Sequence, residues 1–140
     1  MTSNQTVVDE RPTECERSEY YVLGGRHLGS AVAHRLRADG PPVCIVDESY
    51  DQSETSGFRG DPTDIRTLEE AGVATASTVV VATASDSRNL LIAQLVRAYF
   101  DEITIIVLTN VPDRLELFTE AGHDPVSATS ALSDAIMDAI

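Results

Sequence analysis

The sequence of 140 residues predicts one α/β domain in which helices cover both faces of a mostly parallel, doubly wound sheet. Short apolar runs alternate with segments of helical period from residue 20 onward. The glycine-rich turn 24–29 (GGRHLG) directly follows the first apolar run, and Asp47 directly follows the second. A dinucleotide-binding βαβ unit has this layout: a strand, a glycine turn, a helix, a second strand and an acidic residue. We therefore expect a Rossmann-type domain with six strands in the order 3-2-1-4-5-6.

The first half of the chain contains three expected strands and two expected helices. Residues 20–23 form the first strand, and residues 28–36 repeat apolar side chains at helical spacing until Gly40-Pro41-Pro42 ends the helix. Residues 43–46 are continuously apolar, which is typical of a parallel strand buried on both faces. After a polar loop we expect a short strand at 57–60 and a helix at 61–70 that ends at Gly72.

The second half continues the alternation. The β-branched run 78–82 is the clearest strand, and Ser85-Asp86-Ser87 offers capping side chains for a helix at 88–100. Residues 103–108 predict the fifth strand, and Pro112 suits the first turn of a helix that ends near Gly122. We expect a short sixth strand at 125–126 and a last helix at 131–140.

The charge balance is strongly acidic. The chain has 23 acidic residues against 10 basic ones, all of them arginine, and a formal net charge of −13. This composition fits an ordinary soluble acidic protein, but the absence of lysine favours adaptation to high salt, where ions screen the repulsion among surface carboxylates. It argues against nonspecific binding to nucleic acid, which needs basic patches.

The first 19 residues are polar and are expected to form a flexible arm that precedes a domain at 20–140. Cys15 lies in this arm and Cys44 in a buried strand, which predicts two reduced thiols in a cytoplasmic protein, not a disulfide. No apolar run approaches the ~18–20 residues of a membrane span, so no direct membrane insertion is expected. The three histidines lack the spacing of metal ligands.

Several short motifs occur in a fixed order. They are the glycine turn, Asp47, Gly60-Asp61-Pro62-Thr63, Ala82-Thr83, Asp86-Ser87-Arg88-Asn89-Leu90 and Gly122-His123-Asp124-Pro125-Val126. With this set, the chain from residue 20 to about 136 resembles the nucleotide-binding domain of Trk/Ktr-type potassium-transport regulators, the RCK or TrkA N-terminal domain.

The resemblance implies a regulatory protein, not an enzyme. Members of this family bind NAD or NADH, or ATP or ADP, and pass the nucleotide state to a membrane potassium transporter or channel. They work in the cytoplasm, and some are held at the inner face of the membrane because they bind that partner. They assemble as homodimers or larger rings. Many carry a second domain after this one, so we expect either a stand-alone domain or part of a longer protein.

The candidate nucleotide-binding residues come from the turn and from the ends of three strands. Asp47 lies 23 residues after Gly24, which is close to the usual spacing for a carboxylate that accepts the ribose hydroxyls, and its charge favours NAD or an adenine nucleotide over NADP. The resemblance places Asp61 near the adenine edge. The full set is Gly24, Gly25, Arg26, His27, Leu28, Gly29, Asp47, Asp61, Thr83 and Ala84.

Arg26 occupies the place of the second glycine in the G-x-G-x-x-G fingerprint, where the backbone normally approaches the pyrophosphate. Its side chain either fills the pyrophosphate channel or pairs with phosphate as a guanidinium clamp. If it fills the channel, the domain is a degenerate one that serves as a dimerisation scaffold. Independently of Arg26, the apolar face of the last helix, with Leu132, Ile136 and Ile140, is either an interface or packed on the chain's own sheet.

Two enzyme classes are weaker alternatives. A small NAD-dependent oxidoreductase would need room for a substrate domain, and a proton relay through lysine is impossible in a chain without lysine. A methyltransferase also places an acid after the second strand, but nothing else in the sequence favours that class.

Overall fold

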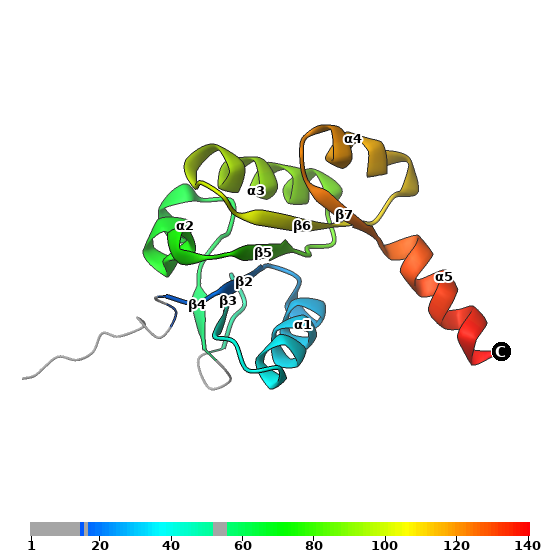
Figure 1. The fold of residues 1–140 in the computed structure, drawn as a ribbon, viewed down its shortest axis with the longest axis horizontal. Helices are drawn as coiled ribbons and strands as arrows, with labels where there is room; N and C mark the ends of the chain where they lie inside the picture. Colours follow the sequence, from blue (N-terminus) through cyan, green and yellow to red (C-terminus); the bar gives the residue numbers. More distant parts are fainter. Residues whose placement is uncertain (1–14, 16, 52–55) are drawn as a thin grey trace, which may run out of the picture.

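The computed structural model describes residue 15, residues 17–51 and residues 56–140. Its centre is a six-stranded sheet in the order β4-β3-β2-β5-β6-β7, in which every neighbouring pair is parallel. The strands are β2 (Tyr20–Leu23), β3 (Val43–Asp47), β4 (Gly57–Arg59), β5 (Thr78–Val81), β6 (Thr104–Thr109) and β7 (Asp124–Ser127) (Figure 1). Counted along the chain, this is the order 3-2-1-4-5-6, so the predicted doubly wound fold is confirmed.

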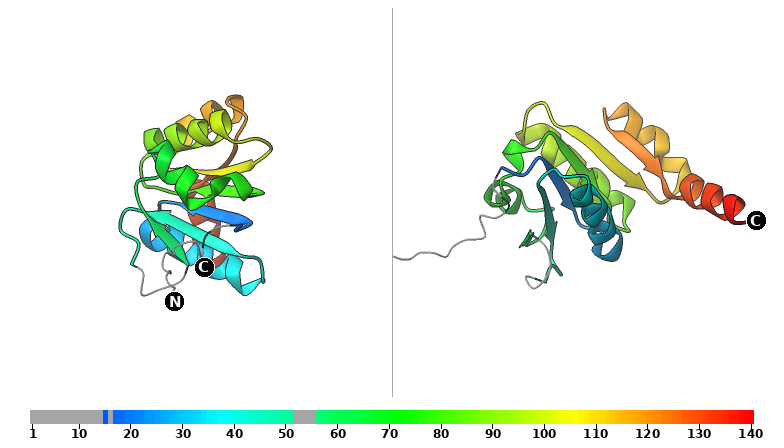
Figure 2. Two further views of the ribbon diagram at one scale, coloured as in Figure 1. Left: turned by 90° about the vertical axis from the view of Figure 1, so that its left-hand side faces the viewer. Right: turned by 60° about the horizontal axis from the view of Figure 1, so that its bottom comes forward.

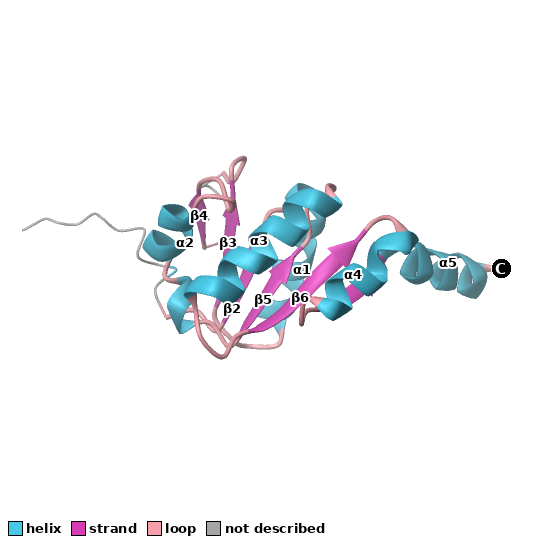
Figure 3. Ribbon diagram, turned by 90° about the horizontal axis from the view of Figure 1, so that it is seen from above, coloured by secondary structure: helices cyan, strands magenta, loops and turns pink. Residues whose placement is uncertain are grey.

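The helices are divided unequally between the two faces of the sheet. Three of them, α2 (Ile65–Ala71), α3 (Asp86–Tyr99) and α4 (Leu115–Glu120), cover one face, whereas α1 (Arg26–Ala38) covers the other (Figures 1 and 3). Two 3₁₀ turns, Val73–Thr75 and Pro112–Arg114, precede β5 and α4. The last helix, α5 (Ala128–Ala139), extends away from the sheet beyond β7 (Figure 2).

Alternating strand residues build two apolar layers because successive side chains point to opposite faces. Tyr21, Leu23, Val79 and Val81 belong to the larger cluster under α2, α3 and α4, and Val22 belongs to the smaller cluster under α1. The α1 layer ends before β6 and β7. Val80, Ile106 and Leu108 are therefore only half buried on that face.

Capping residues explain where the helices begin and end. Asp64 accepts a hydrogen bond from the Arg66 N–H, so α2 begins at residue 65 and not at the expected residue 61. Gly72 ends α2 with φ at 89°, and Ser85 caps α3 by accepting from the Arg88 N–H. Ser127 caps α5, which makes the last helix three residues longer at its start than the sequence predicts.

The two cysteines form a disulfide, Cys15–Cys44, so the prediction of reduced thiols was wrong. Both side chains are buried, and Cys15 is part of the larger core cluster. The Tyr21 hydroxyl lies 2.6 Å from the Cys15 carbonyl oxygen and 2.8 Å from that of Ala71, which anchors the segment before β2 to the end of α2. Residues 1–14 and 16 of the expected arm lie outside the described residues.

Candidate functional site

A cavity of about 300 Å³ opens at the carboxyl ends of the central strands. It lies where the chain order reverses between β2 and β5, which is the topological switch point that binds ligands in doubly wound sheets. It is lined by Gly24, Gly25, Arg26, Asp47, Glu48, Pro62, Thr83, Ala84, Ser85 and Arg88.

The glycine turn fits tightly between β2, α1 and the end of β5. Gly24 has φ at 76°, and a Cβ atom there would lie 2.5 Å from the Thr83 Cγ2 atom. A Cβ atom at Gly29 would lie 2.2 Å from the carbonyl oxygen of Gly24, so that glycine allows α1 to pack closely on β2. Gly24 and Gly29 thus have the structural roles of the first and third fingerprint glycines.

Asp47 is held in place by donors from two segments. Its Oδ2 atom accepts the backbone N–H of Arg26 at 3.0 Å, and its Oδ1 atom accepts the N–H and the hydroxyl of Ser49, each at 2.9 Å. Burial alone would raise the pKa of Asp47. The hydrogen bonds from Ser49 and Arg26 outweigh this effect and lower the pKa below its ordinary value. The carboxylate is therefore ionised and oriented beside the glycine turn.

Arg88 adds a cation that the sequence argument did not select. It lies in the first turn of α3, and its guanidinium donates to Asp61 Oδ1 at 3.0 Å and lies 3.7 Å from Glu48 Oε1. This ion pair connects the loops after β3 and β4 with α3 around the cavity. No local motif could indicate this pairing, because the two acids precede Arg88 by 40 and 27 residues and only the fold brings them together.

A buried polar network fixes the loop after β5. The Asn89 side chain accepts from the Thr83 N–H and donates to the Thr83 and Leu108 carbonyl oxygens. Asp86 accepts the backbone N–H groups of Asn110 at 2.7 Å and Val111 at 2.9 Å. Asn89 thus positions the loop after β5 and Asp86 the loop after β6, and neither residue lines the cavity.

Six of the ten candidate residues line the cavity: Gly24, Gly25, Arg26, Asp47, Thr83 and Ala84. The other four do not. His27 lines an adjacent cavity beyond Arg26, Gly29 is buried beneath the turn, and Leu28 lines an apolar groove next to the sheet. Asp61 reaches the cavity through its ion pair with Arg88. Sequence reasoning missed Glu48, Pro62, Ser85 and Arg88.

The described residues contain no cluster of three or more histidine, cysteine or acidic side chains that would hold a metal ion. None of the helices in this part of the chain is both long enough and apolar enough to cross a membrane.

Residues 20–129 match the TrkA-N domain model. A Trk system potassium uptake protein TrkA homologue from Methanothermobacter thermautotrophicus is 34% identical over 112 residues, which cover 75% of this chain and 51% of the relative. The chain thus spans about half the length of that relative.

Two solved structures share the fold. The NAD(P)-binding domain of an exopolyphosphatase-related protein from Archaeoglobus fulgidus has a TM-score of 0.77 at 29% identity and covers 86% of this chain and 96% of that one. The structure of GsuK bound to ADP has a TM-score of 0.76 at 26% identity and covers 90% of this chain and 34% of that one. The match over residues 20–129 and the ordered site motifs agree, and the chain belongs to the TrkA-N domain family.

Proposed function

We propose that this chain is a nucleotide-binding regulatory module that controls a membrane potassium transporter or channel from the cytoplasm. The observation that carries the proposal is the cavity at the switch point, where the glycine turn, the ionised Asp47 and Arg26 converge. A nucleotide would place its phosphate at the turn and its ribose hydroxyls against Asp47. The proposed ligand is an adenine nucleotide, either NAD or NADH, or ATP or ADP.

Regulation, not catalysis, is the proposed role. The polar groups that line the cavity are backbone amides, hydroxyls, oriented carboxylates and arginines, which suit binding. The relative from Methanothermobacter thermautotrophicus is a potassium uptake protein, which supports a potassium transport system as the partner.

Calorimetric titration with NAD, NADH, ADP and ATP tests nucleotide binding. We expect saturable binding of at least one of them by the wild type. Asp47→Asn should weaken this binding about tenfold or more, because a carboxylate accepts ribose hydroxyls more strongly than an amide does. Asp39→Asn is the matched control, since Asp39 is exposed at the end of α1, away from the cavity. Equal affinities of the wild type and Asp47→Asn would contradict the proposed site.

A second role, a dimerisation scaffold, is favoured by one specific observation. Every residue of α5 from Ala131 onward is exposed. The helical spacing places Leu132, Ile136 and Ile140 on one face, opposite Asp134 and Asp138. An apolar groove of about 610 Å³ lies beside it, on the sheet face that α1 leaves uncovered. Its lining includes Val32, Val80, Ile106, Leu108 and Val126.

The helix follows β7 without a connecting loop, because Ser127 both ends the strand and caps the helix. Its first residues Ala128, Ala131 and Leu132 line one end of the chain's own groove. The rest of the helix leads away from the sheet (Figure 2). We propose that α5 lies in the groove of a second copy and that the exchange is reciprocal, which closes a twofold dimer.

Light scattering measures this assembly directly. Ile136→Asp should convert a wild-type dimer into a monomer because it places a charge in the apolar contact. Ser130→Asp adds the same charge at an exposed position on the other side of the helix and should leave the dimer intact. A monomeric wild type at high salt, or a dimeric Ile136→Asp variant, would contradict the exchange of α5.

A further inference from the structure

Arg26 combines an unusual backbone conformation with an exposed guanidinium group. Its φ angle is 48°, its side chain is exposed, and it borders both the switch-point cavity and a second cavity of about 300 Å³ that His27 and Ser30 also line. The described residues offer its guanidinium neither a hydrogen bond nor an ion pair. Arg88, the other cation of the cavity, is already paired with Asp61.

The turn is poorly suited to a phosphate in the middle of a ligand. A bridging pyrophosphate needs close approach of the backbone at the second fingerprint position and a free N–H group there. Here the position carries an arginine side chain, and its N–H donates to Asp47. A dinucleotide must continue past its pyrophosphate to a second nucleoside, so it would meet a bulky side chain and find one donor fewer at this point. The diphosphate of ADP ends here and need not pass Arg26.

The same arginine is well suited to a phosphate at the end of a ligand. The terminal phosphate group of a nucleoside phosphate carries a charge of about −1.5 to −2 at neutral pH and three acceptor oxygens, whereas each phosphate within a dinucleotide carries a single charge. The guanidinium fork binds such a group through two parallel hydrogen bonds. Asp47 and Glu48 line the cavity. Among the described residues Arg88 is paired with Asp61, whereas the Arg26 guanidinium makes no salt bridge and acts on Asp47 only through its charge, so an anion gains most at Arg26.

The extent of the cavity agrees with a ligand that has one nucleoside. Its lining comes from the ends of β2, β3, β4 and β5 and from α3, and no residue from the end of β6 or β7 contributes. A dinucleotide binds across both halves of a doubly wound sheet. The loop over the second half is tied to α3, because Asp86 accepts the N–H groups of Asn110 and Val111.

We propose that Arg26 makes the site selective for a nucleoside phosphate that ends in a terminal phosphate group, with ADP as its representative, over a dinucleotide such as NAD. The proposal rests on the nucleotide-binding function proposed above and specifies the ligand class of that same cavity. In it, Arg26 contacts the terminal phosphate, Asp47 accepts the ribose hydroxyls, and Arg88 keeps the loops after β3 and β4 together.

Titration of the whole chain with ADP and with NAD tests the selectivity, using the wild type, Arg26→Gly and Arg35→Ala as the control on the same helix. The wild type should bind ADP about tenfold or more tightly than NAD, since a charge-assisted bidentate contact is present only with ADP. Arg26→Gly should weaken ADP binding and strengthen NAD binding, so that the order of the two affinities inverts. Arg35→Ala should match the wild type.

Each of the other outcomes contradicts the proposed selectivity. A wild type that binds NAD as tightly as ADP, or an Arg26→Gly variant that weakens both ligands by the same factor, removes the role of Arg26. If only Arg26→Gly binds any nucleotide, Arg26 blocks the site and does not select at it. If no variant binds either ligand although circular dichroism shows that all are folded, the proposed nucleotide function fails together with the selectivity.

Discussion

Arg26 is held in a backbone conformation that favours glycine. With φ at 48° it lies in the left-handed region, where a residue with a Cβ atom is destabilised by about 1 to 2 kcal/mol. Arg26→Gly should therefore raise the free energy of unfolding by about 1 kcal/mol, as measured by urea denaturation. Arg35→Gly, in the regular interior of α1, should lower it by about 0.5 to 1 kcal/mol. A loss of stability in Arg26→Gly would show that the side chain has a structural contact.

Asp86 is the carboxylate whose loss should most affect the shape of the ligand edge. It is buried, and three hydrogen bonds from Asn110 and Val111 end on its two oxygens. Asp86→Ala leaves the two backbone N–H groups without their partner and should lower the free energy of unfolding by about 2 to 3 kcal/mol. Asp113→Ala, at an exposed position in the 3₁₀ turn that follows, is the control. Equal denaturation midpoints for the two variants would contradict the bracing role.

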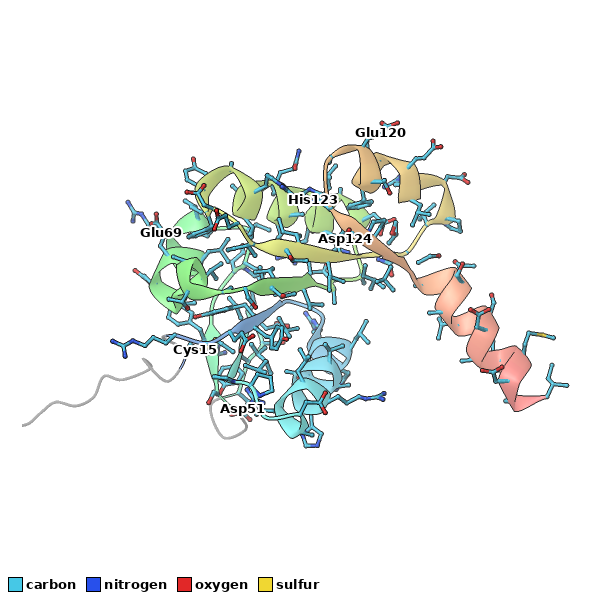
Figure 4. The ribbon with its side chains drawn as sticks, in the orientation of Figure 1. Cys15, Asp51, Glu69, Glu120, His123 and Asp124 are labelled. Atoms are coloured by element: carbon cyan, nitrogen blue, oxygen red, sulfur yellow. A yellow bond between two sulfur atoms is a disulfide. The ribbon has the colours of Figure 1, made fainter. Side chains whose placement is uncertain are left out.

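The contact between α3 and β7 should respond to pH. His123 is buried, and its Nε2 atom lies 2.9 Å from Gln94 Oε1 (Figure 4). Burial lowers the pKa of His123 below its ordinary 6.5, and Arg97 adds to this effect, whereas Asp124 opposes it. The unfolded chain therefore binds a proton more readily than the folded chain. The histidine's contribution to stability is complete above pH 6.5 and is lost as the pH falls through the lower folded pKa.

Carboxylates add a second loss of stability at lower pH. For Asp47, Asp61 and Asp86, burial raises the pKa, but hydrogen bonds and nearby arginines outweigh it, so each folded pKa lies below the ordinary 3.8. Their contribution is complete above pH 3.8 and falls as the pH drops below it. Thermal melting from pH 8 to pH 3 should show both losses, and His123→Gln should remove only the first. An unchanged first loss in that variant would exclude His123 as its cause.

The disulfide joins the segment before β2 to the second residue of β3. Closing a loop over a separation of 29 residues is worth about 3 to 4 kcal/mol in the chain-entropy description. Cys15→Ala/Cys44→Ala should lower the free energy of unfolding by about that amount, and reduction of the unfolded wild type should give the same loss. Two reactive thiols in denatured, unreduced protein would show that the bond does not form.

Local patterns were sufficient to predict most helices and strands. They could not predict contacts between residues that are distant in sequence. The apolar runs located β2, β3, β5 and β6, because a buried parallel strand needs continuous apolar residues. The edge strands β4 and β7 are short and only partly apolar, and their positions were expected from the alternation of strands and helices. The glycine turn and Asp47 were likewise visible in one βαβ unit. The disulfide was missed because a polar N-terminal segment gives no sign of packing on the core. Arg88 and Glu48 were missed because a strand order, not a local motif, brings them together.

At the scale of the whole molecule, the charge of −13 opposes both folding and the proposed dimer. Salt screens this repulsion, with a Debye length of about 10 Å at 0.1 M and about 3 Å at 1 M. The urea midpoint should therefore rise as KCl increases from about 0.1 M to 1 M, and the dimer should tighten over the same range. A midpoint that does not change with KCl would contradict adaptation to high salt.

The central claim is that an adenine nucleotide binds at the carboxyl ends of β2, β3 and β5. Amide chemical-shift mapping of the ¹⁵N-labelled chain during titration with ADP, and with NAD as a second probe, tests this claim most directly. We expect saturable shifts that concentrate at Gly24, Gly25, Arg26 and Glu48 and at the loop of Thr83 to Arg88. Absence of shifts with both nucleotides, or shifts confined to α5 and its groove, would contradict it.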